Sequence, residues 1–176
     1  MKFLQTPLLG ALLIEPELLR DERGFFARTF CSEELHKQGV SSQIVQCNIS
    51  YNRLRGTLRG MHFQREPRAE EKLVSCIRGA IFDVIVDLRE GSPTLGKWFG
   101  VELSADNHRL LYVPKGLAHG FQTLTDDAEV YYQMSEFYSP AHASGVRYDD
   151  PALKIIWPLP VTVISEKDRL YQDFQP

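Results

Sequence analysis

Arg59, His62 and Lys72 lie close together in two stretches that favour β structure, "LRGMHFQ" (58–64) and "KLVSCI" (72–77). An imidazole can act as a general base near neutral pH because its ordinary pKa is about 6.5. Arg and Lys side chains can hold an anion or stabilise negative charge that develops during a reaction. These residue types indicate proton transfer on an anionic substrate, with a metal ligand or a hydrogen-bonded core imidazole as the alternatives for His62.

The metal alternative depends on two segments, "GMHFQREPRAEEK" and "VPKGLAHGF". They resemble the two motifs of the cupin barrel, G…H-x-H…E and P-x-G-x-x-H, whose side chains bind one ion in the metal-dependent members. Gln64 stands where the first motif has its second histidine, which leaves His62, His119 and either Glu70 or Glu71. Glutamine is a poor ligand for the transition metals that imidazole suits. We therefore expect no metal at this position.

Whole-chain composition excludes several classes of protein. A chain of 176 residues is long enough for a sizeable core, and we expect one domain over residues 1–176. The net charge of -3 gives no basic field, so nucleic-acid binding is not expected. No apolar run reaches the roughly 20 residues of a membrane span. Three cysteines without a CxxC spacing indicate a reducing compartment, so a cytoplasmic protein is expected.

Most of the chain favours short strands. In "GAIFDVIVDL" (79–88), Phe82, Val84 and Val86 alternate with the acidic Asp83 and Asp87, which predicts a strand. "LLGALLI" (8–14) predicts an N-terminal strand, and "WFGVEL" (98–103) another. Residues 119–140 predict a hairpin with its turn at 125–127. Its second arm would hold Tyr132 and Tyr138 on one face.

One segment favours a helix, "SEELHKQG" (32–39), with Ser32 as N-cap and Gly39 just past its end. Many short strands with Gly/Pro turns and almost no helix predict an all-β jelly-roll barrel or sandwich. Arg59 and His62 have opposite parity, so a regular strand would separate them. A bulge at Gly60 is the device that we expect to turn both side chains inward.

Seven segments, in order, carry a resemblance to a known family: "DERGFFARTF", "GTLRGMHFQ", "KLVSCIRGAIFDVIVDLREGSPTLGKW", "YVPKGLAHGF", "YYQMSEFYSP", "DDPALKIIWP" and "ISEKD". Together they resemble the dTDP-4-dehydrorhamnose 3,5-epimerase family, the RmlC-type cupins, over about residues 2–172. The resemblance implies a homodimeric, cofactor-independent isomerase of deoxysugar biosynthesis whose substrate is a nucleotide-diphosphate 4-keto-6-deoxyhexose. It also implies that N-terminal segments help to complete the neighbour's sheet.

The resemblance assigns roles to individual positions. His62 matches the general base, Asp168 the carboxylate paired with it, and Tyr132 the acid on the opposite face of the sugar. The matches for substrate binding are Arg59, Lys72 and His119 around the sugar and diphosphate, Arg23, Gln46, Asn48 and Lys167 on the nucleotide side, and Tyr138 as the ring that stacks on the base, often reached from the partner subunit.

These residue types suit the implied reaction. The carbonyl of a 4-keto sugar acidifies the C3 and C5 protons, and removing one gives an enolate that needs nearby positive charge. His62 would take the proton with support from Asp168, and Lys72 would stabilise the enolate with help from Arg59. Tyr132 would return a proton on the other face, while the diphosphate holds the sugar in register.

Three departures from the family pattern concern the nucleotide side. Arg28 stands where the family has a glutamate, Ala143 where it has an acidic residue, and the loop "NISYNRLRG" is one residue longer. Arg28 is retained as a candidate contact. These changes leave a CDP-linked sugar as an alternative to a dTDP-linked one. Inversion at C3 alone or at C5 alone is also an alternative to both, because that choice depends on how the sugar ring sits between the two faces. A metal-dependent cupin and a non-catalytic sugar-nucleotide-binding cupin are the rivals from other classes.

Overall fold

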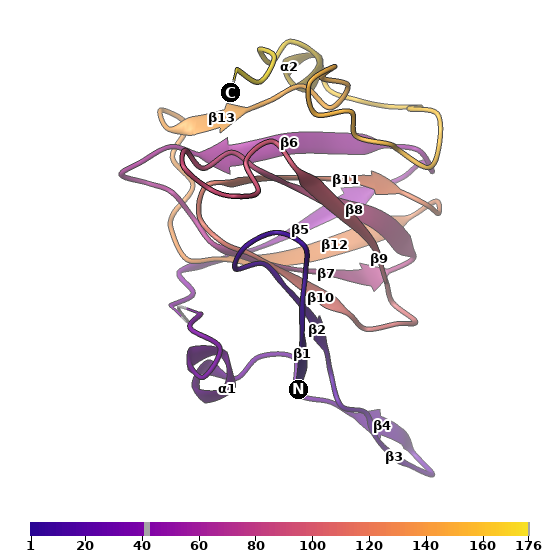
Figure 1. Ribbon diagram of the computed structural model, residues 1–176. Coiled ribbons are helices and arrows are strands. Elements are labelled where there is room, and N and C mark those ends of the chain that lie inside the picture. Colours follow the sequence, from indigo (N-terminus) through magenta and orange to yellow (C-terminus); the bar gives the residue numbers. More distant parts are fainter. Residues whose placement is uncertain (41–42, 176) are drawn as a thin grey trace.

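The computed structural model describes residues 1–40 and 43–175, and most of its regular structure is β-strand (Figure 1). The helices are α1 (Ser32–His36) and α2 (Glu166–Arg169). The strands are β1 (Lys2–Gln5), β2 (Leu12–Glu15), β3 (Leu19–Asp21), β4 (Gly24–Phe26), β5 (Gln46–Asn52), β6 (Leu58–Gln64), β7 (Lys72–Arg78), β8 (Ala80–Asp87), β9 (Trp98–Ser104), β10 (Leu110–Val113), β11 (Leu117–Thr123), β12 (Ala128–Met134) and β13 (Ala143–Gly145).

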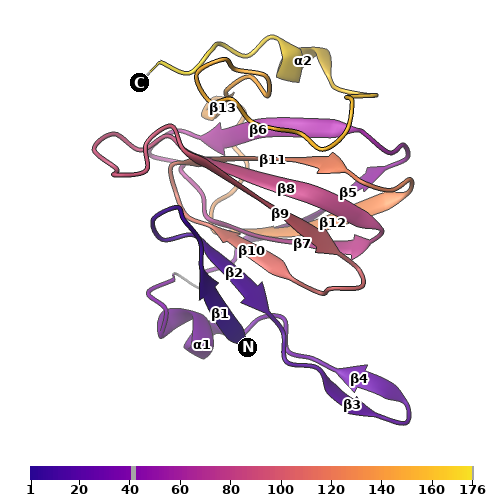
Figure 2. The same cartoon turned by 45° about the vertical axis from the view of Figure 1, so that its right-hand side comes forward.

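Two antiparallel sheets form a sandwich. One has the strand order β1-β2-β10-β7-β12-β5, and the other has the order β13-β6-β11-β8-β9. Figure 2 shows them as two layers, with the second sheet above the first. The prediction of an all-β jelly-roll sandwich with short helices is confirmed.

The core between the two sheets is made of side chains that alternate along the strands. Val74 of β7, Leu111 of β10 and Val130 of β12 meet Ile85 of β8 and Leu103 of β9, and all five are fully buried. The strand predicted over residues 79–88 appears as β8. Both of its faces are covered, because Asp83 and Asp87 are also fully buried.

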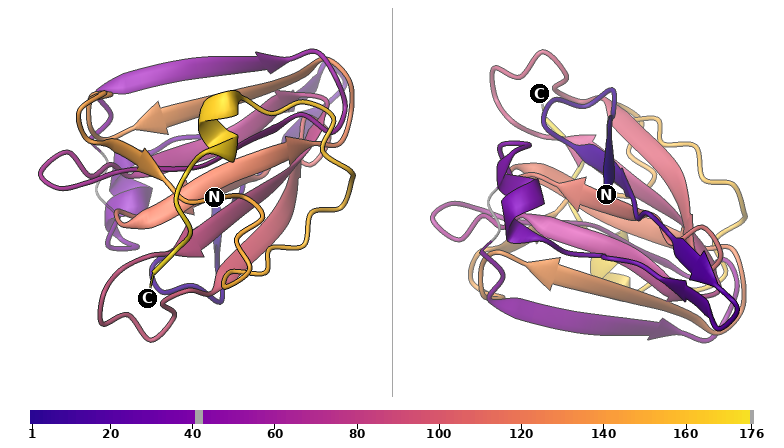
Figure 3. Two further views of the ribbon diagram at one scale, coloured as in Figure 1. Left: turned by 90° about the horizontal axis from the view of Figure 1, so that it is seen from above. Right: turned by 90° about the horizontal axis from the view of Figure 1, so that it is seen from below.

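The C-terminal part of the chain covers the outer face of the five-stranded sheet. Met61, Val84 and Ala118 on that face pack with Val146 and Leu153 from the segment after β12. Figure 3 shows this segment and α2 lying across the sheet when the molecule is seen from above. The fold therefore brings α2 against β6, the strand that carries Arg59 and His62.

The hairpin predicted over residues 119–140 is wrong. β11 pairs with β6 and β8, whereas β12 pairs with β5 and β7 in the other sheet. All residues of β11 are buried and both of its edges are occupied, so the turn at 124–127 carries the chain from one sheet to the other. β12 ends at Met134, so Tyr138 lies in a loop and not on the strand of Tyr132.

Two N-terminal predictions need correction. The strand expected over residues 8–14 begins only at Leu12, because Thr6–Ala11 form a turn with Gly10 at φ +82°. The helix expected over residues 32–39 has Cys31, not Ser32, at its N-cap, and no side chain caps it. The helix ends at His36 with Lys37 as its C-cap, so Gly39 is not the residue just past its end; at φ +75° it closes the following turn, with its N–H donating to the carbonyl of His36.

β3 and β4 form a separate two-stranded arm that projects away from the sandwich (Figures 1 and 2). Leu19 and Phe26 on this arm are 59% and 69% exposed, which is high for large apolar side chains on a folded domain. Within the described residues, neither helix has the length and apolar character to cross a membrane.

Candidate active site

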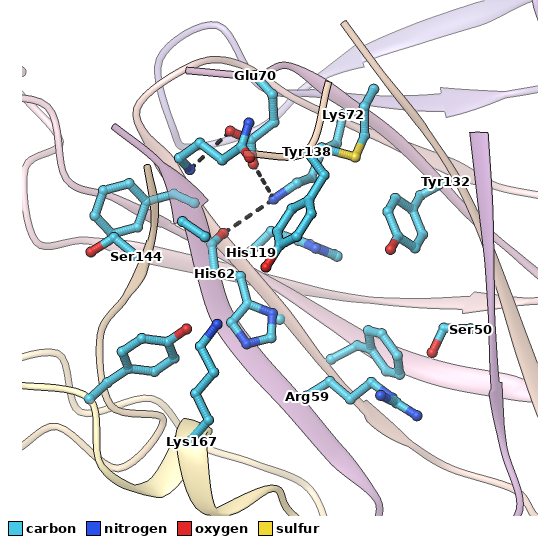
Figure 4. A pocket seen from close by; sticks show the side chains of 17 residues that line it. Ser50, Arg59, His62, Glu70, Lys72, His119, Tyr132, Tyr138, Ser144 and Lys167 are labelled. Carbon is cyan, nitrogen blue, oxygen red and sulfur yellow. Dashed lines mark hydrogen bonds and ion pairs between the residues drawn. The ribbon is translucent and has the colours of Figure 1, made fainter. Parts of the chain in front are cut away.

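A cavity of about 260 Å³ is lined by side chains from both sheets, from the loop after β12 and from α2 (Figure 4). Most of the predicted site residues meet there although they are far apart in sequence. The predicted residues that line it are Arg59, His62, Lys72, His119, Tyr132, Tyr138 and Lys167.

His62 and Asp168 form a hydrogen-bonded pair at one wall of this cavity. Nε2 of His62 lies 2.7 Å from Oδ1 of Asp168, while Oδ2 accepts the backbone N–H of Gly60 at 3.2 Å. Burial alone would raise the pKa of Asp168, but the hydrogen bonds from His62, Gly60 and Ser165 bring it below its ordinary value. The carboxylate is therefore an acceptor, so Nε2 carries a proton and Nδ1 is the nitrogen that can take one.

A second histidine–aspartate pair lies beside the first. Nε2 of His119 is 2.8 Å from Oδ1 of Asp83, and both residues are buried. His119 on β11 is the direct cross-strand partner of His62 on β6. The two imidazoles therefore line the same cavity, each held by its own carboxylate.

Arg59 and His62 both line the cavity because β6 contains one extra residue. His62 is opposite His119 and Arg59 is opposite Phe121, so three steps along β6 match two along β11. Gly60 lies in the bulge at φ +138°, where a Cβ would lie 2.6 Å from the Cα of Gly120. The predicted bulge at Gly60 is confirmed, and only glycine fits there.

Lys72 is held between two acceptors. Its ammonium lies 2.8 Å from Oε1 of Glu70 and donates to the backbone carbonyl of His62 at 3.2 Å. Both Glu70 and Lys72 are buried. An ammonium has three N–H donors, so one is left for a ligand in the cavity, into which Lys72 points in Figure 4.

Tyr132 reaches the cavity from β12, on the other sheet from His62. Burial raises the pKa of Tyr132, and the nearby positive charge of Arg59 offsets part of that rise. The phenol therefore stays protonated at neutral pH and can donate a proton. Arg59 itself donates from Nε to Oδ1 of Asn52 at 2.7 Å, which fixes its guanidinium at the rim.

Other predicted residues lie beside the cavity or away from it. Nε2 of Gln46 donates to Oδ1 of Asn48, and Oε1 of Gln46 accepts the backbone N–H of Tyr138 at 3.0 Å, so this pair supports the Tyr138 loop. Arg23 on the projecting arm pairs with Asp21, and Arg28 pairs with Glu34. Within one chain, neither arginine lines the cavity.

Several lining residues were not singled out from the sequence, above all Tyr171. The ring of Tyr171 lies edge-on to His62 with centroids 5.9 Å apart, and the ammonium of Lys167 lies 5.9 Å from the centroid of the same ring. Tyr171 lies two residues beyond the end of α2 at Arg169, so no helical spacing marked it in the sequence. The other lining residues not predicted as site contacts are Ser50, Phe63, Gln64, Glu70, Gly120, Phe121, Met134, Ala143 and Ser144.

The side chain of Gln64 forms hydrogen bonds within the protein through both its amide nitrogen and its amide oxygen. Its amide nitrogen donates to the carbonyls of Arg68 and Phe137, at 2.8 and 3.2 Å, and its amide oxygen accepts the N–H of Ser139 at 2.6 Å. Glu70 is likewise engaged by Lys72 and by the backbone N–H of Gln64. The described part of the chain contains no group of three His, Cys, Asp or Glu side chains placed to hold a metal ion.

Comparison with known proteins places this geometry in one family. The family model for dTDP-4-dehydrorhamnose 3,5-epimerase matches residues 5–176. The chain belongs to the dTDP-4-dehydrorhamnose 3,5-epimerase family. A curated member from Methanothermobacter thermautotrophicus is 48% identical over 171 residues, which cover 96% of this chain and 91% of that protein. The name of the family describes an epimerase, which is an isomerase.

Solved structures of family members agree. The dTDP-4-dehydrorhamnose 3,5-epimerase of Bacillus anthracis, with TDP and PPi bound, is 48% identical with a TM-score of 0.94, and 98% of each chain is covered. The dTDP-6-deoxy-D-glucose-3,5-epimerase of Legionella pneumophila, in complex with dTDP-4-keto-L-rhamnose, is 39% identical with a TM-score of 0.92, covering 98% of this chain and 92% of that one.

The three positions at which the sequence departs from the pattern of the dTDP-4-dehydrorhamnose 3,5-epimerase family lie in different parts of the structure. Ala143 lines the cavity as the cross-strand partner of Gln64. Arg28 is bound to Glu34 near α1, and residues 53–57 connect β5 to β6. Ala143 and, from the segment with the longer loop, Ser50 line the cavity of this chain, whereas Arg28 does not.

Proposed function

We propose that this protein is a cofactor-independent epimerase that inverts C3 and C5 of a dTDP-linked 4-keto-6-deoxyhexose through enolate intermediates. The observation that carries the proposal is the placement of His62 with Asp168 on one sheet, and of Tyr132 on the other, across a shared cavity. A sugar held between the sheets has a base on one face and an acid on the other. Inversion of a carbon centre requires that arrangement.

The proton is removed by His62. Because Asp168 accepts the Nε2–H, the free Nδ1 takes the proton from the carbon next to the ketone. The Asp168 carboxylate then stabilises the imidazolium, and its buried position keeps water from competing. A non-catalytic binding cupin has no need of such a pair.

The enolate oxygen is stabilised by fixed positive charge. Lys72 has one N–H donor that neither Glu70 nor the carbonyl of His62 uses, and it lies in the cavity wall. A preorganised charge in a partly desolvated site stabilises a developing oxyanion strongly. His119, held by Asp83, is a second donor on the same wall.

Tyr132 completes the reaction by protonating the carbon from the opposite face. Its raised pKa makes the phenol a weak acid toward water, but an enolate carbon is a strong enough base to take the proton. The phenolate is then reprotonated from solvent through the cavity mouth. The His62 imidazolium releases to solvent the proton that it took from the sugar, so both residues return to their starting states.

The nucleotide end lies toward Arg59, Tyr138 and Lys167, which line the cavity with two cations and an aromatic ring. A diphosphate suits the cations, and a nucleobase suits the ring. The bound TDP of the Bacillus anthracis structure and the dTDP-sugar of the Legionella pneumophila structure favour thymidine. The CDP-linked sugar is the alternative that Arg28 and Ala143 motivate.

A homodimer is part of the proposal. β5 is the edge of its sheet next to the cavity, and its outward residues Ile49 and Tyr51 are 61% and 50% exposed. The arm β3–β4 presents Leu19 and Phe26 and carries Arg23 at its tip. Docking the arm of one copy along β5 of the other would cover these apolar side chains and bring arginines to the nucleotide side.

The three free cysteines are compatible with the cytoplasm.

The test is proton exchange in D2O. The enzyme is incubated with dTDP-4-keto-6-deoxyglucose or its CDP counterpart, and ring protons are followed by NMR. Deuterium at both C3 and C5 of an epimerised product is the expected result with the dTDP sugar. Deuterium at one centre would narrow the activity to that centre. Exchange only with the CDP sugar would show that the substrate is CDP-linked and not dTDP-linked. No exchange with either sugar contradicts the function.

A further inference from the structure

Gln64 stands where the cupin motif has a metal-binding histidine, but in this protein its side chain has a structural role. It is 4% exposed, and its two amide N–H groups and its amide oxygen are all hydrogen-bonded to backbone atoms. Two of these backbone partners are the carbonyl of Phe137 and the N–H of Ser139. They are the residues on either side of Tyr138. The buried amide therefore clamps the loop that carries this ring.

Local bonds brace one end of this loop, where the carbonyl of Ser139 accepts the N–H groups of His142 and Ala143. Tyr138 lies between the end of β12 at Met134 and the start of β13 at Ala143, outside any strand, and it is 54% exposed. Its own backbone N–H donates to Oε1 of Gln46. Three consecutive residues are thus fixed by two glutamine side chains, while the ring itself leans into the cavity (Figure 4).

We infer that Gln64 is a positioning residue that preorganises Tyr138 for the nucleobase of the nucleotide sugar, and that it takes no part in proton transfer. The inference rests on the proposed function, because it needs an aromatic ring of the substrate to stack on Tyr138. Fixing the ring before binding removes an ordering cost from the binding step. Chemistry at the sugar depends on His62, Asp168 and Tyr132, whereas the side-chain hydrogen bonds of Gln64 go to Arg68, Phe137 and Ser139.

The three backbone partners of Gln64 explain why an amide is needed at this position. A carboxylate in its place would keep an acceptor for the N–H of Ser139, but it would set a charged oxygen against the carbonyls of Arg68 and Phe137. A methionine of similar length would leave all three backbone groups without this partner. Gln64→Glu and Gln64→Met therefore release the loop by different means.

The experiment measures KM and kcat of both variants with the nucleotide sugar that the wild type turns over. We expect KM to rise about tenfold, with kcat changed by no more than about twofold, which corresponds to the cost of ordering one or two side chains. The same rise is expected in the dissociation constant for the free nucleoside diphosphate, measured by calorimetry. Gln122→Met is the matched control, because Gln122 is also buried and clamps Leu159 by two hydrogen bonds, away from Tyr138.

A double-mutant cycle with Tyr138→Ala separates positioning from general loosening. If Gln64 acts through Tyr138, Gln64→Met raises KM no further in the Tyr138→Ala background. A KM effect that persists in that background overturns the inference. An unchanged KM in a folded variant, or a fall in kcat well beyond about twofold, overturns it as well. If one variant does not fold, the other supplies the comparison. A wild type that neither turns over nor binds these nucleotides would contradict the proposed function instead.

Discussion

His62 and His119 are direct cross-strand partners on β6 and β11, and each imidazole has its own buried carboxylate, Asp168 and Asp83. The two imidazoles differ in their exposure to solvent. The side chain of His62 is 41% exposed, whereas that of His119 is 10% exposed. The more open imidazole can meet a ligand and exchange its proton with solvent, which supports the proposal of His62 as the base and of His119 as a donor.

Asp168→Asn tests this assignment. An amide cannot replace the carboxylate as acceptor of the Nε2–H and stabiliser of the imidazolium, so kcat should fall at least about 100-fold while KM changes little. Steady-state kinetics and deuterium exchange measure this. Glu166→Gln, on the same short helix and exposed, is the control and should leave both constants near wild type. Full activity in Asp168→Asn would remove the carboxylate from the mechanism.

Tyr132→Phe separates the two halves of the reaction. The base remains, so deuterium should still enter the recovered substrate, but the product with inverted configuration should fall at least about 100-fold. Since the pKa of Tyr132 is raised above the ordinary 10.0 of a phenol, the wild type should not lose activity up to about pH 9 through this group. NMR in D2O reads both outcomes.

The neighbouring Tyr131 supplies the control for that experiment. Tyr131 lies on the same strand, but its side chain is on the opposite face and does not line the cavity. Tyr131→Phe should therefore epimerise like the wild type. Equal loss of inversion in both variants would show that the effect is not specific to the cavity.

The pair Glu70 and Lys72 allows stability and catalysis to be separated. Lys72→Met leaves a buried carboxylate whose remaining partner is the N–H of Gln64, so the free energy of unfolding should fall by about 3 kcal/mol. The double variant Glu70→Leu/Lys72→Met removes both charges and should recover most of that loss. Its activity should stay low, because the cation for the enolate is still absent.

Urea unfolding and deuterium exchange on the same preparations provide the measurements. Recovery of stability together with activity in the double variant would mean that Lys72 acts only as a structural partner of Glu70. Activity close to wild type in the single Lys72→Met variant would also contradict its proposed role with the enolate.

Some of the site could be predicted from local pattern. Arg59 and His62 have opposite parity, and the glycine between them is the residue type that permits a bulge, so their convergence followed from the sequence and is confirmed. The alternation along residues 80–87 identified β8 because the period-two signal is local. Features that depend only on neighbouring residues are recoverable in this way.

Other features depend on contacts that local pattern does not encode. The carboxylate partner of His62 lies 106 positions away, among many other acidic residues, and only the family resemblance selected Asp168. The path from β11 to β12 was predicted as a hairpin because a turn within one sheet and a turn between sheets use the same residues. Tyr138 was assigned to a strand, whereas it lies in a loop, where its own N–H donates to Gln46 and the N–H of Ser139 donates to Gln64.

The last prediction concerns acid stability and a group outside the cavity. Asp87 is fully buried at the end of β8 and accepts hydrogen bonds from Arg89, Ser92 and Thr94. Burial alone would raise the pKa of Asp87, but these donors hold it well below the ordinary value of 3.8. A depressed pKa in the folded state contributes stability that is present above about pH 4 and is lost as the pH falls toward the lowered value.

Asp87→Asn should therefore reduce the free energy of unfolding by about 3 kcal/mol at pH 7, and the difference from wild type should shrink as the pH falls below about 4. Urea unfolding at pH 7 and pH 3 measures both values. Asp149→Asn is the control, because the side chain of Asp149 is 51% exposed and its ion pair with Arg147 should contribute less than about 1 kcal/mol. A difference for Asp87→Asn that is as large at pH 3 as at pH 7 would show that the charge of Asp87 is not what stabilises this turn.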